Sequence, residues 1–169
     1  GANLTIQGDR GIDILTLQHP EQIPFFSGGD LTLISDGEIS ADAHFQSGGD
    51  LRFLDLAGTP GSIISLHDPI ILADGDVVLG DYTGVAFKVE AQGSIEAGNI
   101  VITGPDTTLN ADGSGSDVNL LASGRAAILR AGVSAGQPPG SITVSTINTS
   151  DVTGGDGGPI ILEATGDIT

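Results

Sequence analysis

The stretch SGGDLTL at positions 27–33 decides the fold, because it returns twenty residues later as SGGDLRF at positions 47–53. Each copy holds two glycines, an aspartate and two apolar residues separated by one variable position. This alternation places both apolar side chains on the same face of a β-strand. A strand this short cannot bury its apolar face alone, whereas stacked copies can, so the repeat predicts a stack of coils.

Looser copies of this unit predict further coils. GGDLTLISDGEIS at 28–40 aligns without gaps with GGPIILEATGDIT at 157–169 and with GSDVNLLASGRAA at 115–127. The alignment predicts the first inward-facing residue of each successive coil as Leu4, Leu31, Leu51, Val77, Ile100, Val118, Ile142 and Ile160. The second inward residue is then Ile6, Leu33, Phe53, Leu79, Ile102, Leu120, Val144 and Leu162. We therefore expect Leu31, Leu51, Val77 and Val118 to form one buried column.

Other apolar segments predict the remaining strands of each coil. Second strands are expected at 11–14, 37–39, 61–64 and 84–87, each after a glycine, and a third at 69–72. Glycine and proline interrupt nearly every window that could form a helix. Residues 120–133, rich in Ala and Leu, have a weak helical pattern, but we expect strands there too because Ser123-Gly124 matches the turn of the other units.

These patterns together predict an all-β fold, namely a right-handed parallel β-helix (β-solenoid). We expect about seven to eight irregular coils with three short strands per coil. Residues 1–169 are expected to form a single domain that is an internal fragment of a longer repeat protein.

The composition excludes several classes of partner. The net charge is −17 with only five basic residues, whereas a nucleic-acid interface needs clustered Lys and Arg. No apolar run approaches the length that spans a bilayer, so we expect neither nucleic-acid binding nor membrane insertion. Aromatic residues make up 4% of the chain, which disfavours aromatic-lined carbohydrate grooves.

Polar residues precede the first inward position of each unit, which gives two interpretations. The column is Asn3, Asp30, Asp50, Asp76, Asn99, Asp117, Ser141 and Pro159. Such side chains cap turns by accepting hydrogen bonds from nearby backbone amides. Alternatively, Asp30, Asp50 and Asp76 are weak candidates for binding Ca²⁺, because stacking brings their carboxylates together. We favour turn capping, because the GGxGxDxUx calcium repeat is absent.

The three histidines His19, His44 and His67 are spaced by roughly one coil. They are weak candidates for a metal-binding ladder on one side of the stack, because metal sites need convergent ligands. No fourth ligand continues the series, so we favour exposed or locally bonded histidines. Phe25 and Phe45, together with Phe53, are expected to pack as an aromatic stack.

No catalytic or cofactor-binding residue is predicted, and we do not expect an enzyme. A GxSxG string occurs at 132–136, but two prolines follow at 138–139, where a nucleophile elbow needs a helix. Acidic residues at 74, 76 and 81 have no clustered base beside them. An ice-binding solenoid is a further alternative, but Thr143, Thr146 and Thr149 step by three, whereas a flat ladder steps by two.

The units at 28–40 and 157–169 resemble the haemagglutinin-like repeats of bacterial exoproteins. These are the filamentous-haemagglutinin-type proteins of two-partner secretion and similar cyanobacterial repeat proteins. The resemblance covers nearly the whole chain through composition and period. It implies a right-handed β-helix, export across the outer membrane through a transporter partner, and a secreted or cell-surface location. Asn-Pro-Asn-type motifs of the secretion domain are absent, so the segment corresponds to the repeat shaft, and no functional residue carries over.

The leading hypothesis is therefore a structural, adhesive segment of a surface exoprotein that binds an unknown surface receptor or glycan. One alternative is a polysaccharide-active β-helix enzyme of pectate-lyase-like architecture, which needs acids converging on one face. The other is a calcium-stabilised binding module, with no other cofactor expected.

Overall fold

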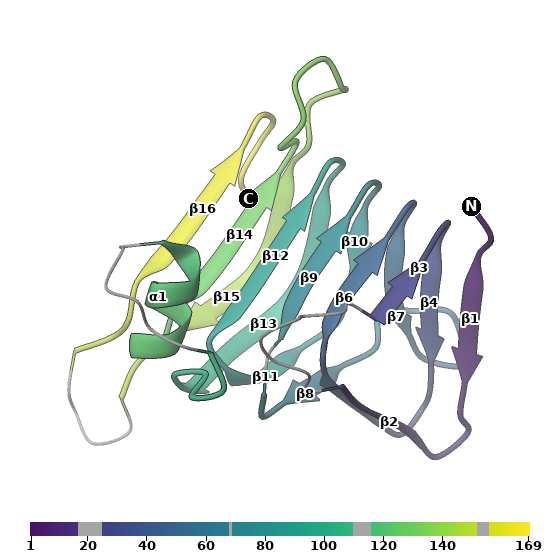
Figure 1. Cartoon of the computed structure of the whole chain (residues 1–169), viewed down its shortest axis with the longest axis horizontal. Helices are drawn as coiled ribbons and strands as arrows, with labels where there is room; N and C mark the ends of the chain where they lie inside the picture. The colour runs from purple at the N-terminus through teal and green to yellow at the C-terminus, as the bar shows by residue number, and fades with distance from the viewer. Residues whose placement is uncertain (17–24, 68, 110–115, 152–155) are drawn as a thin grey trace.

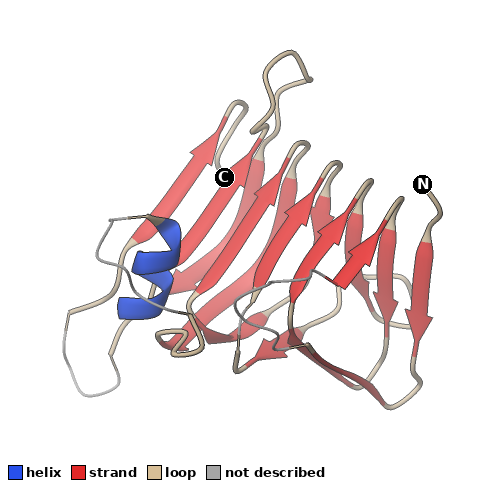
Figure 2. Cartoon of the chain, in the orientation of Figure 1, coloured by secondary structure: helices blue, strands red, loops and turns tan. Residues whose placement is uncertain are grey.

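The computed structural model describes residues 1–16, 25–67, 69–109, 116–151 and 156–169. Its regular structure is dominated by parallel β-strands in a nearly closed arrangement, as Figures 1 and 2 show. The prediction of an all-β fold with parallel strands is thus confirmed, and the arrangement is consistent with a β-helix. The described residues include no helix of the length and apolarity needed to cross a bilayer.

Ten strands form a sheet that bends into two wings. The wings meet at β13 (Ile95–Gly104), whose first part pairs with β10 and whose second part pairs with β11. The first wing holds β1 (Leu4–Gln7), β4 (Leu31–Ile34), β7 (Leu51–Leu54) and β10 (Val77–Val78). The second wing holds β11 (Tyr82–Val85), β8 (Ile63–Ser65), β5 (Glu38–Asp42) and β2 (Gly11–Leu15). Strand β15 (Ile142–Asn148) runs alongside both parts of β13.

The second sheet has six strands and lies in front of the first wing in Figure 1, with the second wing below both. It contains β3 (Phe25–Ser27), β6 (His44–Ser47), β9 (Ile70–Ala73), β12 (Phe87–Ala91), β14 (Ala127–Ala131) and β16 (Ile160–Ala164), in that order. The chain therefore passes from the first wing to the second wing and then to the second sheet before it returns.

The core lies between these three sides and consists of stacked columns of apolar residues. One column is Leu4, Leu31, Leu51, Val77, Ile95, Ile142 and Ile168. Phe45 packs between Phe25 and Phe53 with ring centroids 5.6 and 5.9 Å apart, which confirms the predicted aromatic stack. Each buried Leu, Ile or Phe side chain stabilises the fold by roughly 1.5–3 kcal/mol, so the columns provide the main favourable free energy.

The predicted column is right for Leu31, Leu51 and Val77, which are fully buried and in register. It is wrong for Ile100, which pairs with Tyr82 in the second wing, and for Ile160, which belongs to β16. The places assigned to them are taken by Ile95 and Ile168. Consecutive members of the column are 18 to 27 residues apart except across the step from β13 to β15, where paired residues lie 47 apart. This long step contains an insertion, and an alignment that expects a copy every 18 to 27 residues places an extra copy within it.

The insertion contains α1 (Asp117–Ser123), so the prediction of strands over 120–133 is wrong for 120–123 and right for 127–131, which form β14. Val118 and Leu120 are therefore helical and do not face the core of the coil. Ser116 caps the helix by accepting a hydrogen bond from the backbone N–H of Asn119. Helix α1 packs through Leu121 on the outer face of the second sheet and forms a second apolar cluster there. The segment 84–87 is also mispredicted, because it spans the corner between β11 and β12.

Candidate functional site

The predicted column of polar residues forms a ladder of hydrogen bonds that joins successive coils. The backbone N–H of each member donates to the side chain of the member one coil earlier. Asp30 donates to Asn3 Oδ1 at 3.0 Å, Asp50 to Asp30 Oδ1 at 2.9 Å, and Asp76 to Asp50 Oδ1 at 2.8 Å. We call this column the corner ladder; it comprises Asn3, Asp30, Asp50, Asp76, Ser94, Ser141 and Asp167.

The glycine before most ladder residues makes room for the acceptor of the preceding coil. A Cβ at Gly49 would lie 2.2 Å from Asp30 Oδ1, and one at Gly75 would lie 2.1 Å from Asp50 Oδ1. Real Cβ atoms do not approach oxygens this closely, so no other residue fits without displacing the carboxylate. The Gly-Asp pair in SGGDLTL is therefore explained by hydrogen bonding between coils. Hydrogen bonds to charged groups contribute about 1.5–3 kcal/mol each.

Two expectations about this column change. Capping is carried out across coils, between residues 18 to 47 apart, whereas turn capping was expected two residues away. Three members were misassigned, because Asn99 lies at the corner between the two wings, Asp117 lies in α1 and Pro159 precedes β16. At its own corner Asn99 continues a shorter ladder, since its N–H donates to Asp81 Oδ1 at 2.7 Å and its Oδ1 accepts from Thr146 Oγ1 at 2.8 Å.

The structure places the weak metal candidates as follows. One carboxylate oxygen of each of Asp30, Asp50 and Asp76 accepts a ladder hydrogen bond. His44 opens β6, His67 lies before β9, and His19 lies outside the described residues. Within the described ranges, no group of three or more His, Asp or Glu side chains is close enough to hold a metal ion.

A third corner is held by Asp42, which is buried at the end of β5. Its Oδ1 accepts from Ser65 Oγ at 2.9 Å, from the backbone N–H of Leu66 at 2.7 Å and from that of His67 at 3.1 Å. These three hydrogen bonds satisfy the buried carboxylate of Asp42 and join its coil to the next one.

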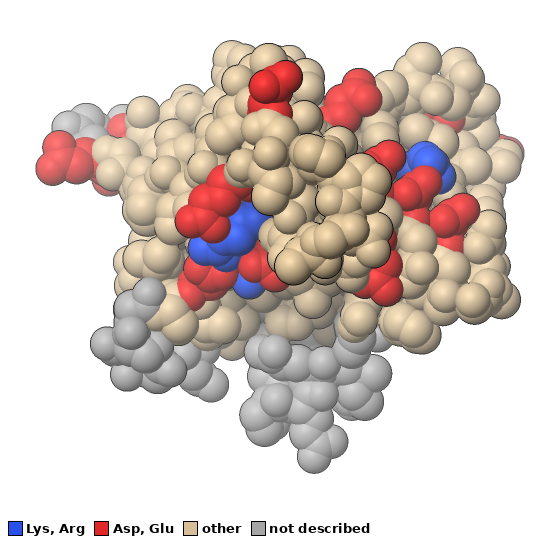
Figure 3. All heavy atoms as spheres, turned by 90° about the horizontal axis from the view of Figure 1, so that it is seen from above, with Lys and Arg blue, Asp and Glu red and all other residues tan. Residues whose placement is uncertain are grey.

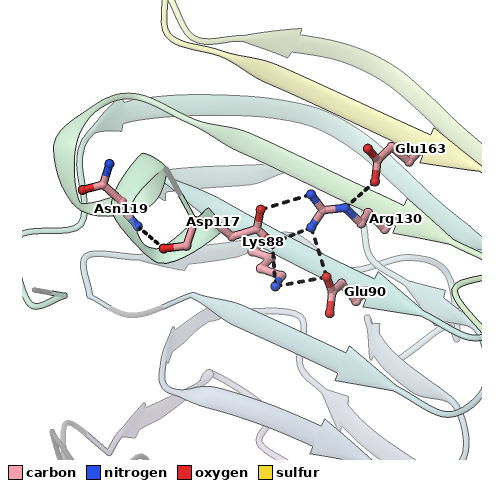
Figure 4. Close-up of polar contacts among 7 residues, drawn as sticks. Lys88, Glu90, Asp117, Asn119, Arg130 and Glu163 are labelled. Atoms are coloured by element: carbon pink, nitrogen blue, oxygen red, sulfur yellow. Dashed lines mark hydrogen bonds and ion pairs between the residues drawn. The ribbon is translucent and has the colours of Figure 1, made fainter. Parts of the chain in front are cut away.

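Five charged side chains form a network on the outer face of the second sheet, beside α1 (Figure 4). Arg130 on β14 pairs with Glu90 on β12, Glu163 on β16 and Asp117 on α1. Lys88 on β12 lies 2.8 Å from Asp117 Oδ2 and 3.0 Å from Glu90 Oε1. The network therefore ties the inserted helix to three neighbouring strands.

The network shifts two pKa values. Hydrogen bonds from Arg130, assisted by Lys88, lower the pKa of Asp117 from 3.8 to about 2 against the opposing effect of burial. The hydrogen bond to Asp117 raises the pKa of Arg130 further above its usual value. The lowered pKa of Asp117 and the raised pKa of Arg130 both favour the charged forms that make this ion pair.

Sequence patterns did not identify this network. Lys88 and Glu90 are two residues apart on one strand, and this spacing in the sequence places both side chains on the same face. Arg130 and Glu163, however, lie 40 and 73 positions beyond Glu90 in the chain, so the sequence gives no sign that they are neighbours. Their alignment follows from the pairing of Glu90 with Arg130 and of Arg130 with Glu163 across β12, β14 and β16.

Two adjoining hollows form a groove across the outer face of the second sheet. The larger, about 450 Å³, is lined by Glu90, Arg130, Glu163 and Thr165 together with Val133. The smaller, about 200 Å³, is lined by Gln46, Leu72, Asp74 and Gln92. Glu90 and Val133 line both hollows, so the two hollows lie next to each other. We call this feature the outer groove.

The GxSxG string at 132–136 lies in the loop that follows β14, next to this groove. Gly132 has a positive φ of 69°, and its N–H donates to the carbonyl of Gly93. The segment is a loop, as predicted, and does not lead into a helix.

Acidic atoms are far more numerous than basic atoms on the face shown in Figure 3, and the basic atoms there lie beside acidic ones. Among the described residues, Arg52, Lys88, Arg125 and Arg130, four of the five basic residues, form ion pairs. The surface therefore presents little uncompensated positive charge to a partner.

Comparison of this chain with protein-family models, with curated proteins and with solved structures gives no match.

Proposed function

We propose that this chain is a structural, adhesive shaft segment of a secreted or cell-surface exoprotein. The corner ladder is the observation that carries the proposal. Its side chains stabilise the stacking of one coil on the next, which is what a shaft requires. The ion-pair network similarly fixes α1 to the sheet. The resemblance of SGGDLTL and its copies to haemagglutinin-like repeats supports export across the outer membrane by a transporter partner.

The proposal includes the finer form of the fold. The strands wind in a right-handed β-helix of about seven to eight irregular coils, since parallel crossovers are almost always right-handed. Each coil adds one rung to the shaft, at a spacing of about 4.8 Å along its axis.

Surface labelling tests the location. Antibodies raised against residues 1–169 should label intact cells of the source organism as strongly as permeabilised cells, and external protease should remove the signal. A cytoplasmic protein serves as the control for cell integrity. Labelling that appears only after permeabilisation would overturn the proposal.

Adhesion is tested separately with the purified chain on beads. Coated beads should bind the surfaces that the source cells colonise, and soluble chain should compete for them. Beads carrying heat-unfolded chain provide the matched control. If folded and unfolded chains bind equally, the segment is a shaft without an adhesive surface.

A calcium-stabilised module is a second candidate, favoured by the stacking of Asp30, Asp50 and Asp76 in one ladder. It predicts that Ca²⁺ raises the melting temperature and that Asp50→Asn or Asp76→Asn removes the gain. An unchanged melting temperature would exclude it.

A polysaccharide-active enzyme is the third candidate, favoured by the outer groove with its acids Glu90 and Glu163. It predicts cleavage of at least one member of a glycan panel, with the cleavage lost in Glu163→Gln. A panel without cleavage products would remove this candidate.

A further inference from the structure

The outer groove runs across strands of the second sheet rather than along them. Its floor includes outward side chains at matching positions of neighbouring strands, namely Gln46, Leu72, Glu90, Arg130 and Glu163 on β6, β9, β12, β14 and β16. Four strand spacings of about 4.8 Å give a floor roughly 19 Å long. A fully extended peptide rises about 3.3 Å per residue, so the floor accommodates about six residues.

The charge of the groove and its network is negative. Two cations, Lys88 and Arg130, stand against four carboxylates, those of Asp74, Glu90, Asp117 and Glu163. The two cations already have carboxylate partners, so they offer little to an anionic ligand. Glu163 has a side chain that is 62% exposed and Asp74 accepts from Gln92 Nε2 at 2.6 Å, so each hollow has one carboxylate with further acceptor capacity.

The remaining lining fits a peptide better than a glycan. Gln46, Gln92 and Thr165 supply donors and acceptors for a peptide backbone, and Leu72 and Val133 supply apolar surface for the methylene stems of Lys and Arg. No aromatic side chain lines either hollow, so the stacking surface that sugar rings commonly use is missing among the residues that form it.

We propose that the outer groove binds an extended basic peptide segment of a partner protein. Lysine or arginine side chains of the segment pair with Asp74 and Glu163, and its backbone lies over the floor between them. The inference goes beyond the proposed function, because the shaft role rests on the corner ladder and does not require the outer groove.

Fluorescence anisotropy with a labelled peptide of six alternating lysine and serine residues tests the inference on the full chain. The double variant Asp74→Asn, Glu163→Gln should weaken binding by about tenfold or more through loss of two charge pairs. The matched control Glu38→Gln, Glu96→Gln removes the same charge from exposed positions on the ten-stranded sheet and should weaken binding by less than about twofold. Equal losses in the two double variants would mean that only the overall negative field attracts the peptide, and would overturn the proposal.

A variant without a charge change guards against misfolding of the double variant. Val133 is 49% exposed where the two hollows meet, so Val133→Trp should block the groove while leaving the melting temperature unchanged. Unaltered peptide binding in Val133→Trp would overturn the proposal. Binding of a chitosan hexamer as tight as that of the lysine peptide would assign the groove to amino sugars instead and overturn the peptide assignment.

Discussion

Two aspartates that follow the same Gly-x pattern in the sequence, Asp30 and Asp117, have different structural roles. GGD at 28–30 forms a corner at which Asp30 accepts a hydrogen bond from the backbone of Asp50, one coil later. In the copy at 115–117, Ser116 caps α1 and Asp117 pairs with Lys88 and Arg130. Asp30 therefore joins two coils, whereas Asp117 joins the helix to the second sheet.

The corner ladder and the contacts of α1 stabilise the fold in different ways. The corner ladder connects backbone to side chain at each step, and the glycine beside it admits no Cβ. The contacts of α1 join side chains on the outer face of the second sheet, which are partly exposed to solvent. We therefore expect changes at the corner to cost more free energy of unfolding than changes at the helix.

The largest effect is expected for Gly49→Ala. The new Cβ would lie 2.2 Å from Asp30 Oδ1 and would displace the carboxylate from the N–H of Asp50. Loss of a charge-assisted hydrogen bond together with local strain should lower the free energy of unfolding by about 3 kcal/mol, measured by urea denaturation. Gly104→Ala is the control, because a Cβ there meets nothing within 4 Å. Similar stabilities for the two variants would contradict the role of the corner glycine.

A smaller effect is expected for Asp76→Ala, which removes the acceptor at 2.7 Å from the N–H of Ser94. The expected loss is about 2 kcal/mol in the same denaturation experiment. Asp76→Asn keeps an acceptor oxygen at that position, as Asn3 does in the first rung, and should change stability by less than about 0.5 kcal/mol. If the two variants are equally destabilised, the charge and not the hydrogen bond is what matters at the corner.

At the helix, Asp117→Asn should lower the free energy of unfolding at neutral pH by about 1 kcal/mol, once screening by solvent is allowed for. The pKa of Asp117 is lowered from 3.8 to about 2, mainly by hydrogen bonds from Arg130. The ionised carboxylate therefore stabilises the fold above about pH 4, and this contribution fades as the pH falls from 3.8 to about 2. Thermal melts of both proteins between pH 7 and pH 2 should converge at the acid end. A constant difference across this range would show that the charge of Asp117 is not responsible.

The smallest effect on global stability is expected for Ser116→Ala, which removes the side-chain acceptor for the N–H of Asn119. Loss of an N-cap costs about 1 kcal/mol of helix stability, and here the loss is local because α1 lies outside the main core. Hydrogen exchange should accelerate at the amides of Leu120 and Leu121 and stay unchanged in β4 and β7. Faster exchange in those strands would mean that α1 and the core unfold together.

The repeat predicted the fold class from a few positions. Leu31, Leu51 and Val77 were placed correctly in the core, because alternation at two residues and the preceding Gly-Asp pair occur together there. Ile95 and Ile168 were missed, because Ile100 and Ile160 also follow a glycine by two positions and lie at similar steps along the chain. Val118 was wrongly included, because the chain steps by 47 positions from β13 to β15 and leaves room for an extra copy. Ile95 and Ile168 are each preceded by a short version of the motif, Gly93-Ser94 and Gly166-Asp167. Such a pair also occurs in loops, so the sequence does not identify it as a corner.

The candidate site was less predictable than the fold. The column of Asp30, Asp50 and Asp76 was recognised, but the direction of its hydrogen bonds was not, because a local turn and a bond between coils need the same residues. The outer groove gave no sequence signal, since Glu90, Arg130 and Glu163 are separated by long segments.

The amino-acid sequence by itself determined that short strands stack in parallel, because period-two alternation and corner glycines are local properties of the chain. Only the tertiary structure decided which copies of the motif are true corners, because a corner requires an acceptor from another coil. It also decided that α1 lies against the second sheet and that Glu90, Arg130 and Glu163 share one row, since strand pairing across an insertion sets that register.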